Sequence, residues 1–344
     1  MTFQAFKLNT LCLTLLTLVL FPLQIHAAAG NSKLLPAPLL YLDSALTHHV
    51  LVAEKSTHKL YLYENDKSFP RLIKIFDMAT GKKSGNKIFE GDHRTPEGVY
   101  FLNSFIPNAE LLGRYGEEGK IYGVGAFVLD YPNPMDRTAK KSGGGIWLHS
   151  TNDETRIEKG LDSRGCFVVK NNDLKEISTY IELSKTIFIS VHEMHYLNEE
   201  NWVSTRVALK TLVDSWLTSW KNEDIDSYMQ SYHPEDFVDS FRGNYNQFKS
   251  YKRSVFAAPG APQIDLTNLS ILLSKDYAVV TFLQNYQSNT IKDTGHKTLY
   301  LKRDDYYNWK IVFENWRKVP NPEQYVLDFR PSMRFFETTG TVAQ

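Results

Sequence analysis

Short apolar runs, separated by glycine, proline and polar residues, fill the chain between residues 48 and 195. They are rich in valine, isoleucine, leucine and aromatic residues, which is typical of β-strands. The first two runs lie in HVLVAEKSTHKLYLYEN and flank the polar KSTH, which predicts a hairpin. The later runs are RLIKIFDMAT, EGVYFLNSFI, GAFVLDY, GIWLHS, GCFVVK and TIFISVHEM. The pattern predicts a mainly β domain over residues 48–195.

The hydrophobic period changes at Trp202. Apolar residues then recur at helical spacing, and a second helical pattern starts at Ile225 after the polar NED. The apolar positions of the first helix are Leu209, Leu212, Val213, Trp216, Leu217 and Trp220. Strand-like runs follow in LTNLSILLSKDYAVVTFLQNYQS and HKTLYLKRDDYYNWKIVFENWRKV. Helices followed by antiparallel strands predict an α+β domain over residues 202–320.

The remaining segments lie outside these two domains. Residues 30–47 contain two prolines and are interpreted as an N-terminal arm, and residues 321–344 lose periodicity and form a C-terminal tail. Residues 1–29 combine Lys7, an apolar run and three alanines at the end, which is the order of a secretory signal peptide. The apolar run is shorter than the roughly 20 residues that a membrane span needs. We therefore expect an exported protein in the periplasm or cell envelope.

Charge argues against one class of partner. Lys plus Arg and Asp plus Glu both number 39 in 344 residues, so the chain has no basic excess. Binding that depends on phosphate neutralisation requires clustered positive charge, and nucleic acid is therefore not an expected partner.

Cysteine usage singles out one thiol. The chain has two cysteines, and Cys12 lies inside the apolar part of the predicted signal peptide. Cleavage leaves Cys166 alone, so no disulfide forms within one mature chain. In an oxidising compartment, a lone cysteine is a buried apolar residue, a partner for another chain, or a reactive nucleophile.

Nearby residues favour the nucleophile. A thiol attacks as its thiolate and needs a base or a positive potential, and His149 ends one predicted strand while Cys166 begins the next. Two adjacent strand ends bring such side chains together. Gly165 permits a sharp turn that leaves nearby amides free to face an oxyanion, and Arg164 adds positive charge beside the thiol.

The segment from His149 to SRGC resembles the signature of the L,D-transpeptidase (YkuD-like) cysteine enzymes of bacterial cell walls. GDHRTPEGVYFL, HKLYLY and LDYPNPMDR resemble further segments of this family, so the resemblance covers residues 48–195. It implies that Cys166 is the acyl-accepting nucleophile, that His149 is its base, and that the Ser150 carbonyl holds the imidazole. The amides of Gly165 and Cys166 are then expected to line the oxyanion site.

Other residues near the motif are assigned from the same resemblance. Ser163 and Arg164 occupy variable positions of the motif, and many family members have His in place of Arg164. Many members also have Arg at the position of Val168. Because Val168 replaces this Arg, the way in which an acceptor would be bound stays open. Expected substrate contacts are Tyr131, Trp147, Thr151 and Asn152. The polar loop with Lys82, Lys83 and Arg94 is interpreted first as a solvated hairpin loop, and contact of one of these residues with a glycan or a carboxylate is the alternative.

The second domain resembles the NTF2-like fold, and the two domains together resemble the helical-cell-shape L,D-carboxypeptidases of spiral bacteria. The expected substrate is a peptidoglycan stem peptide. The second domain is interpreted as a site for a small ligand, a glycan or a protein partner, and homodimerisation stays open. No cofactor is expected. His192 and His195 are three residues apart, which does not match the zinc-protease helix, so no metal site is predicted either.

These observations predict that Cys166 attacks a stem tetrapeptide, forms a thioester and releases D-Ala. Transfer to an amine of a second stem, as in an L,D-transpeptidase, is placed first. Hydrolysis to a tripeptide, as in an L,D-carboxypeptidase that determines cell shape, is the close alternative. Attachment or release of a wall-bound lipoprotein through the same thioester, and a non-catalytic wall-binding module, are the remaining hypotheses.

Overall fold

The structure is a computed structural model that describes residues 1, 33–43, 47–258, 262–289, 291–319 and 329–336. Apart from Met1, the predicted signal peptide lies outside the described residues. None of the helices in the described part of the chain is long and apolar enough to cross a membrane.

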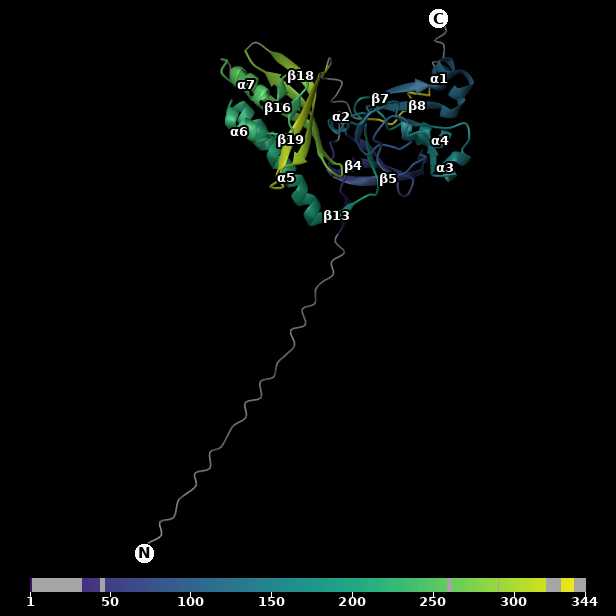
Figure 1. Ribbon diagram of the computed structural model, residues 1–344, viewed down its shortest axis with the longest axis horizontal. Helices are drawn as coiled ribbons and strands as arrows, with labels where there is room; N and C mark the ends of the chain where they lie inside the picture. The colour runs from purple at the N-terminus through teal and green to yellow at the C-terminus, as the bar shows by residue number, and fades with distance from the viewer. Residues whose placement is uncertain (2–32, 44–46, 259–261, 290, 320–328, 337–344) are drawn as a thin grey trace. The chain divides into compact units, whose positions relative to one another are not determined.

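An eight-stranded mixed sheet forms the first half of the described chain (Figure 1). Its strands occur in the order β11-β9-β8-β7-β12-β3-β4-β5. β12 pairs in parallel with β3 and β11 pairs in parallel with β9, while the other neighbours are antiparallel. The strand bounds are β3 His49–Glu54, β4 Lys59–Asp66, β5 Phe69–Asp77, β7 Gly98–Pro107, β8 Gly125–Leu129, β9 Trp147–His149, β11 Phe167–Val168 and β12 Ile187–Val191.

Alternation of side chains places this sheet between two hydrophobic cores. In β3, Leu51 and Ala53 enter one core while Val50 and Val52 enter the other. β7 and β12 divide their apolar residues in the same way. Because both faces are covered, the central strands read as continuous apolar runs rather than alternating ones.

Short elements between the strands complete this half. β6 (Thr80–Gly81) pairs in parallel with β10 (Leu161–Ser163). The helices are α1 Asn108–Tyr115, the 3-10 helix η1 Gly116–Tyr122, α2 Pro134–Thr138, α3 Thr155–Glu158 and α4 Asn171–Ser178. They were not predicted from the sequence, because each spans eight residues or fewer, too few for a clear hydrophobic period.

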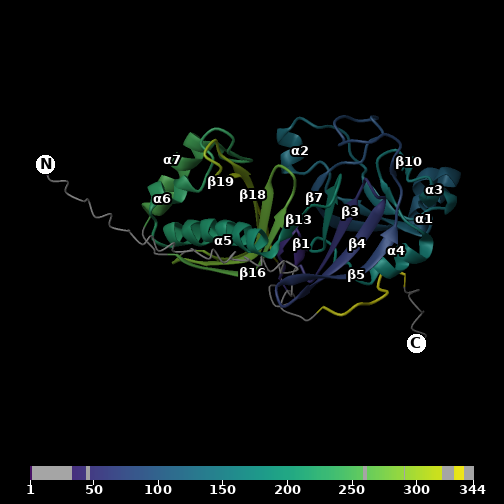
Figure 2. The ribbon, with the colours of Figure 1, turned by 90° about the horizontal axis from the view of Figure 1, so that it is seen from below.

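The second half packs helices against a curved antiparallel sheet (Figures 1 and 2). Helix α5 (Glu199–Lys221) buries Trp202, Val213 and Trp216, as its helical spacing predicts. The sheet has the order β19-β18-β17-β16-β2. The remaining elements are β13 Tyr196–Asn198, α6 Ile225–Gln230, β14 Val238–Asp239, β15 Gly243–Asn244, α7 Tyr245–Phe256, β16 Gln263–Leu273, β17 Ala278–Gln287, β18 Lys292–Arg303 and β19 Trp309–Lys318.

The predicted arm supplies strands to the second half. β1 (Leu34–Pro36) pairs with β13, and β2 (Leu39–Tyr41) pairs with β16. These pairings were not predicted from the sequence, in which the segment was interpreted only as an N-terminal arm. They join segments more than 150 residues apart in the sequence, so no local pattern reveals them.

The two halves share packing and hydrogen bonds. One core combines Val50 and Val99 of the first sheet with Leu272 and Val279 of the second. The Tyr277 hydroxyl accepts a hydrogen bond of 2.9 Å from the Val99 amide.

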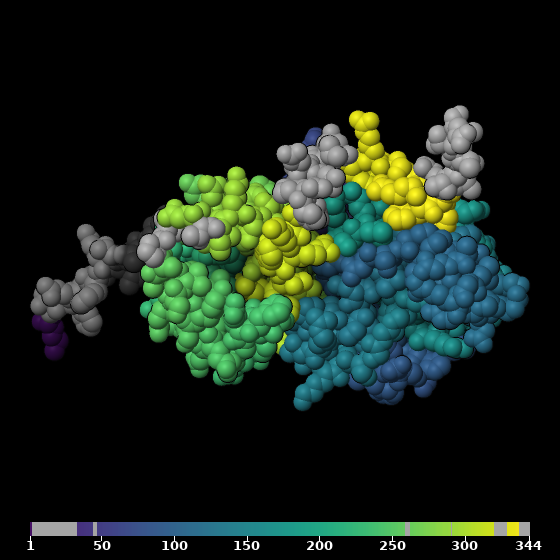
Figure 3. Space-filling model, turned by 90° about the horizontal axis from the view of Figure 1, so that it is seen from above, coloured from purple at the N-terminus to yellow at the C-terminus, as the bar shows by residue number. Residues whose placement is uncertain are grey.

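Part of the predicted tail also packs on the first half. Figure 3 shows residues 329–336, in yellow, against its surface. The Phe329 ring stacks on His48 at 3.8 Å, and Phe335 packs against Phe105 and Phe127.

Candidate active site

The pairing of β9 with β11 brings His149 and Cys166 to one place. Val168 is the register partner of His149, and Phe167 is the partner of Leu148. Cys166 directly precedes β11, so its side chain and that of His149 line the same cavity of about 690 Å³. The expectation that two adjacent strand ends meet is therefore met in the structure.

His149 is held by the residue that follows it. Its Nδ1 lies 2.5 Å from the carbonyl oxygen of Ser150, and a carbonyl only accepts, so Nδ1 carries the proton. In the neutral ring, Nε2 then has the free lone pair. Ser150 is itself fixed, because its hydroxyl accepts from the Val124 amide at 2.7 Å. The Tyr122 ring packs edge-on against the imidazole.

The turn before Cys166 is stabilised by Ser163. The Ser163 hydroxyl accepts a bond of 3.0 Å from the Gly165 amide and donates one of 2.6 Å to the Cys166 carbonyl. The Gly165 amide was expected to line the oxyanion site, but it is already bonded within the turn. The amide of Cys166 has no acceptor within the described part of the chain. The Cys166 amide is therefore free to donate a hydrogen bond to a bound group.

Gly165 is required at its position by backbone geometry. Its φ is +130°, and a Cβ there would lie 2.9 Å from the carbonyl oxygen of Arg94. The Thr95 hydroxyl donates a 3.0 Å bond to the Gly165 carbonyl. The segment that resembles the family's Thr-Pro-x-Gly motif thus holds the nucleophile turn directly.

Burial makes the resting pair electrically neutral. It raises the pKa of the Cys166 thiol to about 11, against the smaller effects of the Trp147 amide, Arg156 and Lys87. It also lowers the pKa of His149 to about 4, with the Ser150 carbonyl opposing and Arg156 adding to the shift. The thiol donates to the Gly145 carbonyl at 3.4 Å. At neutral pH the site therefore holds a thiol and a neutral imidazole.

The cavity around this pair carries both signs of charge. Its cationic lining residues are Lys82, Arg156, Lys159 and Arg164, and its acidic ones are Glu117, Glu118, Asp153 and Asp162. Among the described residues, Lys82 and Arg164 have no ion-pair partner. Two unpaired cations beside a nucleophile suit a substrate that carries carboxylates.

The four expected substrate contacts occupy different places. Asn152 lines the cavity. Thr151 is fully buried and accepts from Arg156, and Trp147 is buried against Tyr122. Tyr131 lies in the core, where its hydroxyl donates to the Ser142 carbonyl. Only Asn152 of the four has the exposure to the cavity that contact with a substrate needs.

Arg156 is a site residue that sequence reasoning missed. Its guanidinium is buried, forms an ion pair with Asp162 and donates to Thr151 Oγ1 at 3.1 Å and to the Ile121 carbonyl at 3.3 Å. It ties together three segments of the cavity wall. Arg156 and Lys87 oppose the rise in the pKa of the thiol, and Arg164, the cation expected beside the thiol, lines the same cavity. No sequence motif links Arg156 to Cys166, so nothing in the sequence indicated that Arg156 belongs to the site.

The remaining sequence features lie elsewhere. Val168 is fully buried and pairs with Ala79, so its side chain takes no part in the cavity. His192 and His195 follow β12 and line a separate cavity. Within the described ranges, no group of three or more His, Cys, Asp or Glu residues is arranged to hold a metal ion.

The fold and site define a two-domain protein with a cysteine and a histidine in one cavity of its first domain. A family model for the L,D-transpeptidase catalytic domain (YkuD) matches residues 48–189. A model for the Cds6 C-terminal NTF2-like domain matches residues 208–315. No match was found among curated protein sequences.

Two solved structures resemble nearly the whole chain. Bd1075 of Bdellovibrio bacteriovorus is 30% identical, with 84% of this chain and 100% of that chain covered and a TM-score of 0.72. The helical cell shape determining protein Pgp2 of Campylobacter jejuni is 24% identical, with 80% and 94% covered and a TM-score of 0.63. The second likeness shows a shared fold. The chain belongs to the YkuD L,D-transpeptidase family, in a form that carries a C-terminal Cds6-type NTF2-like domain.

Proposed function

We propose that the protein is an exported peptidoglycan enzyme that cleaves the terminal D-Ala from stem tetrapeptides through a Cys166 thioester. The observation that carries this proposal is the pairing of β9 with β11, which places Cys166 and a correctly protonated His149 in one cavity. Export rests on the signal-peptide pattern of residues 1–29.

The chemistry uses groups whose positions are described above. Sγ of Cys166 attacks the carbonyl carbon of the third stem residue, and its proton passes to His149 Nε2. The Cys166 amide donates to the developing oxyanion. The tetrahedral intermediate collapses, the bond to the D-Ala nitrogen breaks, and His149 returns the proton to the leaving amine. The products of this half-reaction are the thioester and free D-Ala.

For the second half-reaction we propose water as the acceptor. His149 takes a proton from water as the water oxygen attacks the thioester carbonyl. The C–S bond then breaks, and His149 returns the proton to Sγ, which gives a tripeptide and the free thiol. Support comes from the two-domain arrangement, which is shared over most of the chain with a protein described as determining helical cell shape. A role in cell shape through trimmed stems is the corresponding biological proposal.

Transfer to a stem-peptide amine is the second candidate. It is favoured by the match of residues 48–189 to the L,D-transpeptidase catalytic domain. The amine would replace water in the same attack and produce a crosslink between two third residues.

One experiment separates the two. The chain without residues 1–29 is incubated with purified disaccharide tetrapeptide, and products are read by liquid chromatography and mass spectrometry. Tripeptide that depends on Cys166 supports trimming, and dimers formed with loss of one D-Ala support transpeptidation. Equal product from a Cys166→Ala protein contradicts both. Asn222→Ala is a suitable control for general handling, because Asn222 caps α5 far along the chain from the cysteine.

A further inference from the structure

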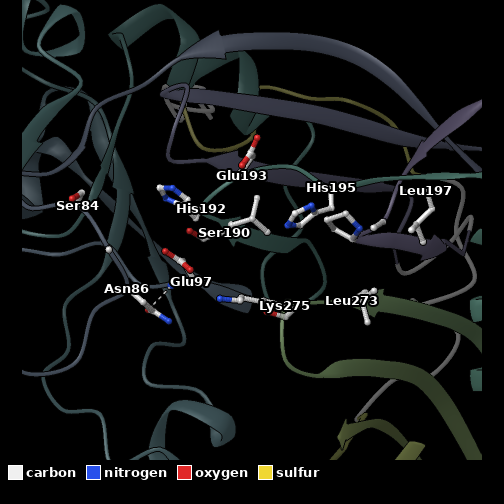
Figure 4. Close-up of a pocket in the computed structure, with 15 residues that line it drawn as sticks. Ser84, Asn86, Glu97, Ser190, His192, Glu193, His195, Leu197, Leu273 and Lys275 are labelled. Carbon is white, nitrogen blue, oxygen red and sulfur yellow. Dashed lines mark hydrogen bonds between the residues drawn. The ribbon is translucent and has the colours of Figure 1, made fainter. Parts of the chain in front are cut away.

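A second cavity, of about 760 Å³, lies apart from the cysteine (Figure 4). It shares no lining residue with the Cys166 cavity. Residues of the first half, of the N-terminal arm and of the NTF2-like half all line it. Its volume falls within the range of roughly 300–1,000 Å³ that is usual for small-ligand sites.

The wall of this cavity is built around a buried lysine. Lys55 Nζ donates to the Gly85 carbonyl at 2.6 Å, to the Thr95 carbonyl at 2.7 Å and to Glu97 Oε1 at 2.8 Å. The Glu97 amide donates to Asn86 Oδ1 at 2.9 Å. These bonds fix the segment 84–86 and Glu97, which line the cavity, before any ligand arrives. A prearranged wall lowers the entropy cost of binding.

Ser190 supplies a second, independent indication of a ligand. It lies on β12, lines the cavity and is 0% exposed, yet its hydroxyl has no hydrogen-bond partner among the described residues. A buried polar group without a partner is costly, and nearly all such groups are satisfied in native proteins. A ligand in this cavity would provide the missing partner.

The lining indicates which ligand fits. Lys275 is exposed, has no ion-pair partner in the described chain, and extends toward Glu97 and Asn86 in Figure 4. It suits a carboxylate, while Glu97 and Glu193 suit an ammonium group. The apolar part consists of Ala37, Pro38, Val191, Leu197 and Leu273. No Phe, Tyr or Trp lines the cavity, so a sugar ring finds no aromatic face there.

We propose that this cavity binds a second peptidoglycan stem peptide, held by its carboxylate at Lys275 and by a polar group at Ser190. The identity of the peptide rests on the proposed function, whereas the existence of the site rests on the cavity itself. The segment 82–86 touches both cavities, with Lys82 at the cysteine and Ser84, Gly85 and Asn86 here. One chain segment thus lies between a stem being processed and a neighbouring stem.

The test uses calorimetric titration of the chain without residues 1–29, made inactive by Cys166→Ala, with purified disaccharide tetrapeptide. Two binding events per chain are expected. Lys275→Glu should weaken one of them by about tenfold or more, since a lost charge-assisted bond has an effect of this size. Lys292→Glu reverses an exposed charge on β18 outside this lining and should leave both events unchanged.

Ser190→Ala distinguishes a ligand contact from a structural role. It should weaken the same event as Lys275→Glu while leaving the thermal stability of the free protein equal or higher, because it removes an unsatisfied buried hydroxyl. A loss of stability would contradict the proposal, as would a single binding event in the parent or two events insensitive to both variants. Equal binding of the disaccharide without its peptide would overturn the assignment of the carboxylate.

Failure here and failure of the proposed function are separate outcomes. D-Ala release by the protein with Cys166 intact tests the function alone. Release without a second binding event would remove the second site and retain the enzyme.

Discussion

The neutral resting pair predicts slow alkylation of Cys166. The pKa of the thiol is raised to about 11 by burial, whereas a free cysteine has a pKa of roughly 8.5. At pH 7.5 the thiolate fractions are then about 3 in 10,000 and about 1 in 10, a ratio of about 300. A more basic thiolate is a better nucleophile, and a Brønsted slope of about 0.45 over 2.5 units recovers about 13-fold. Alkylation should therefore be about 20-fold slower than for a free thiol.

The assay is the rate of carbamidomethylation by iodoacetamide, followed by intact mass from pH 6 to 12. The chain without residues 1–29 has Cys166 as its one thiol, and a Cys166→Ala protein gives the blank. The side chain is half-buried rather than enclosed, so the reagent can reach it. The rate should rise with pH toward an inflection near 11.

An inflection at or below 8.5 would refute this reasoning, because it would show a thiolate stabilised in the resting protein. A His149→Ala variant then identifies the cause. If the resting state were a thiolate–imidazolium pair, loss of the imidazolium would raise the inflection. With a neutral pair, removal of the ring should not raise it.

Three further outcomes are expected. Ser163→Ala removes both bonds of the nucleophile turn and should lower the free energy of unfolding by about 1–2 kcal/mol in urea titrations, and it should slow D-Ala release. Arg156→Lys keeps the charge near Asp162 but loses the forked geometry, so kcat/KM should fall while a far-ultraviolet circular dichroism spectrum stays unchanged. Burial lowers the pKa of His49 to about 3 and that of His296 to about 4. Between those values and about 6.5 the unfolded chain binds more protons than the folded chain, so the free energy of unfolding should fall as the pH falls, by up to about 1.4 kcal/mol per pH unit for each histidine. Denaturation midpoints measured across this pH range check the expectation.

The strands and the long helix were predictable because their signals are local. β3, β4 and β12 follow apolar runs, and α5 follows the spacing from Leu209 to Trp220. The partners of the arm were not predictable, because β2 pairs with β16 and strand pairing across such distances depends on the whole fold.

The candidate site likewise combines residues that could be predicted from the sequence with residues that could not. The candidate nucleophile Cys166 and base His149 come from a compact motif, and the family resemblance of that motif implied the contact between His149 and the Ser150 carbonyl that the structure contains. The residues that set its electrostatics come from other segments. Arg156 acts from α3, and Thr95 reaches Gly165 from before β7. Residue spacing does not report such contacts, so neither Arg156 nor Thr95 was named as a site residue from the sequence.

The two pKa values also constrain how the reaction begins. Moving the proton from Cys166, with a pKa of about 11, to His149, with a pKa of about 4, spans 11 − 4 = 7 units in the empty site. The attraction between an adjacent thiolate and imidazolium offsets part of this difference, and both shifts still favour the neutral pair in the empty site. For the proposed reaction, a neutral resting pair favours attack that is coupled to proton transfer, with negative charge passing from sulfur to the carbonyl oxygen near the Cys166 amide. On the proposed function, Cys166 would then react chiefly when a substrate carbonyl lies beside that amide, and the neutral thiol of the empty site would be less susceptible to oxidation than a thiolate.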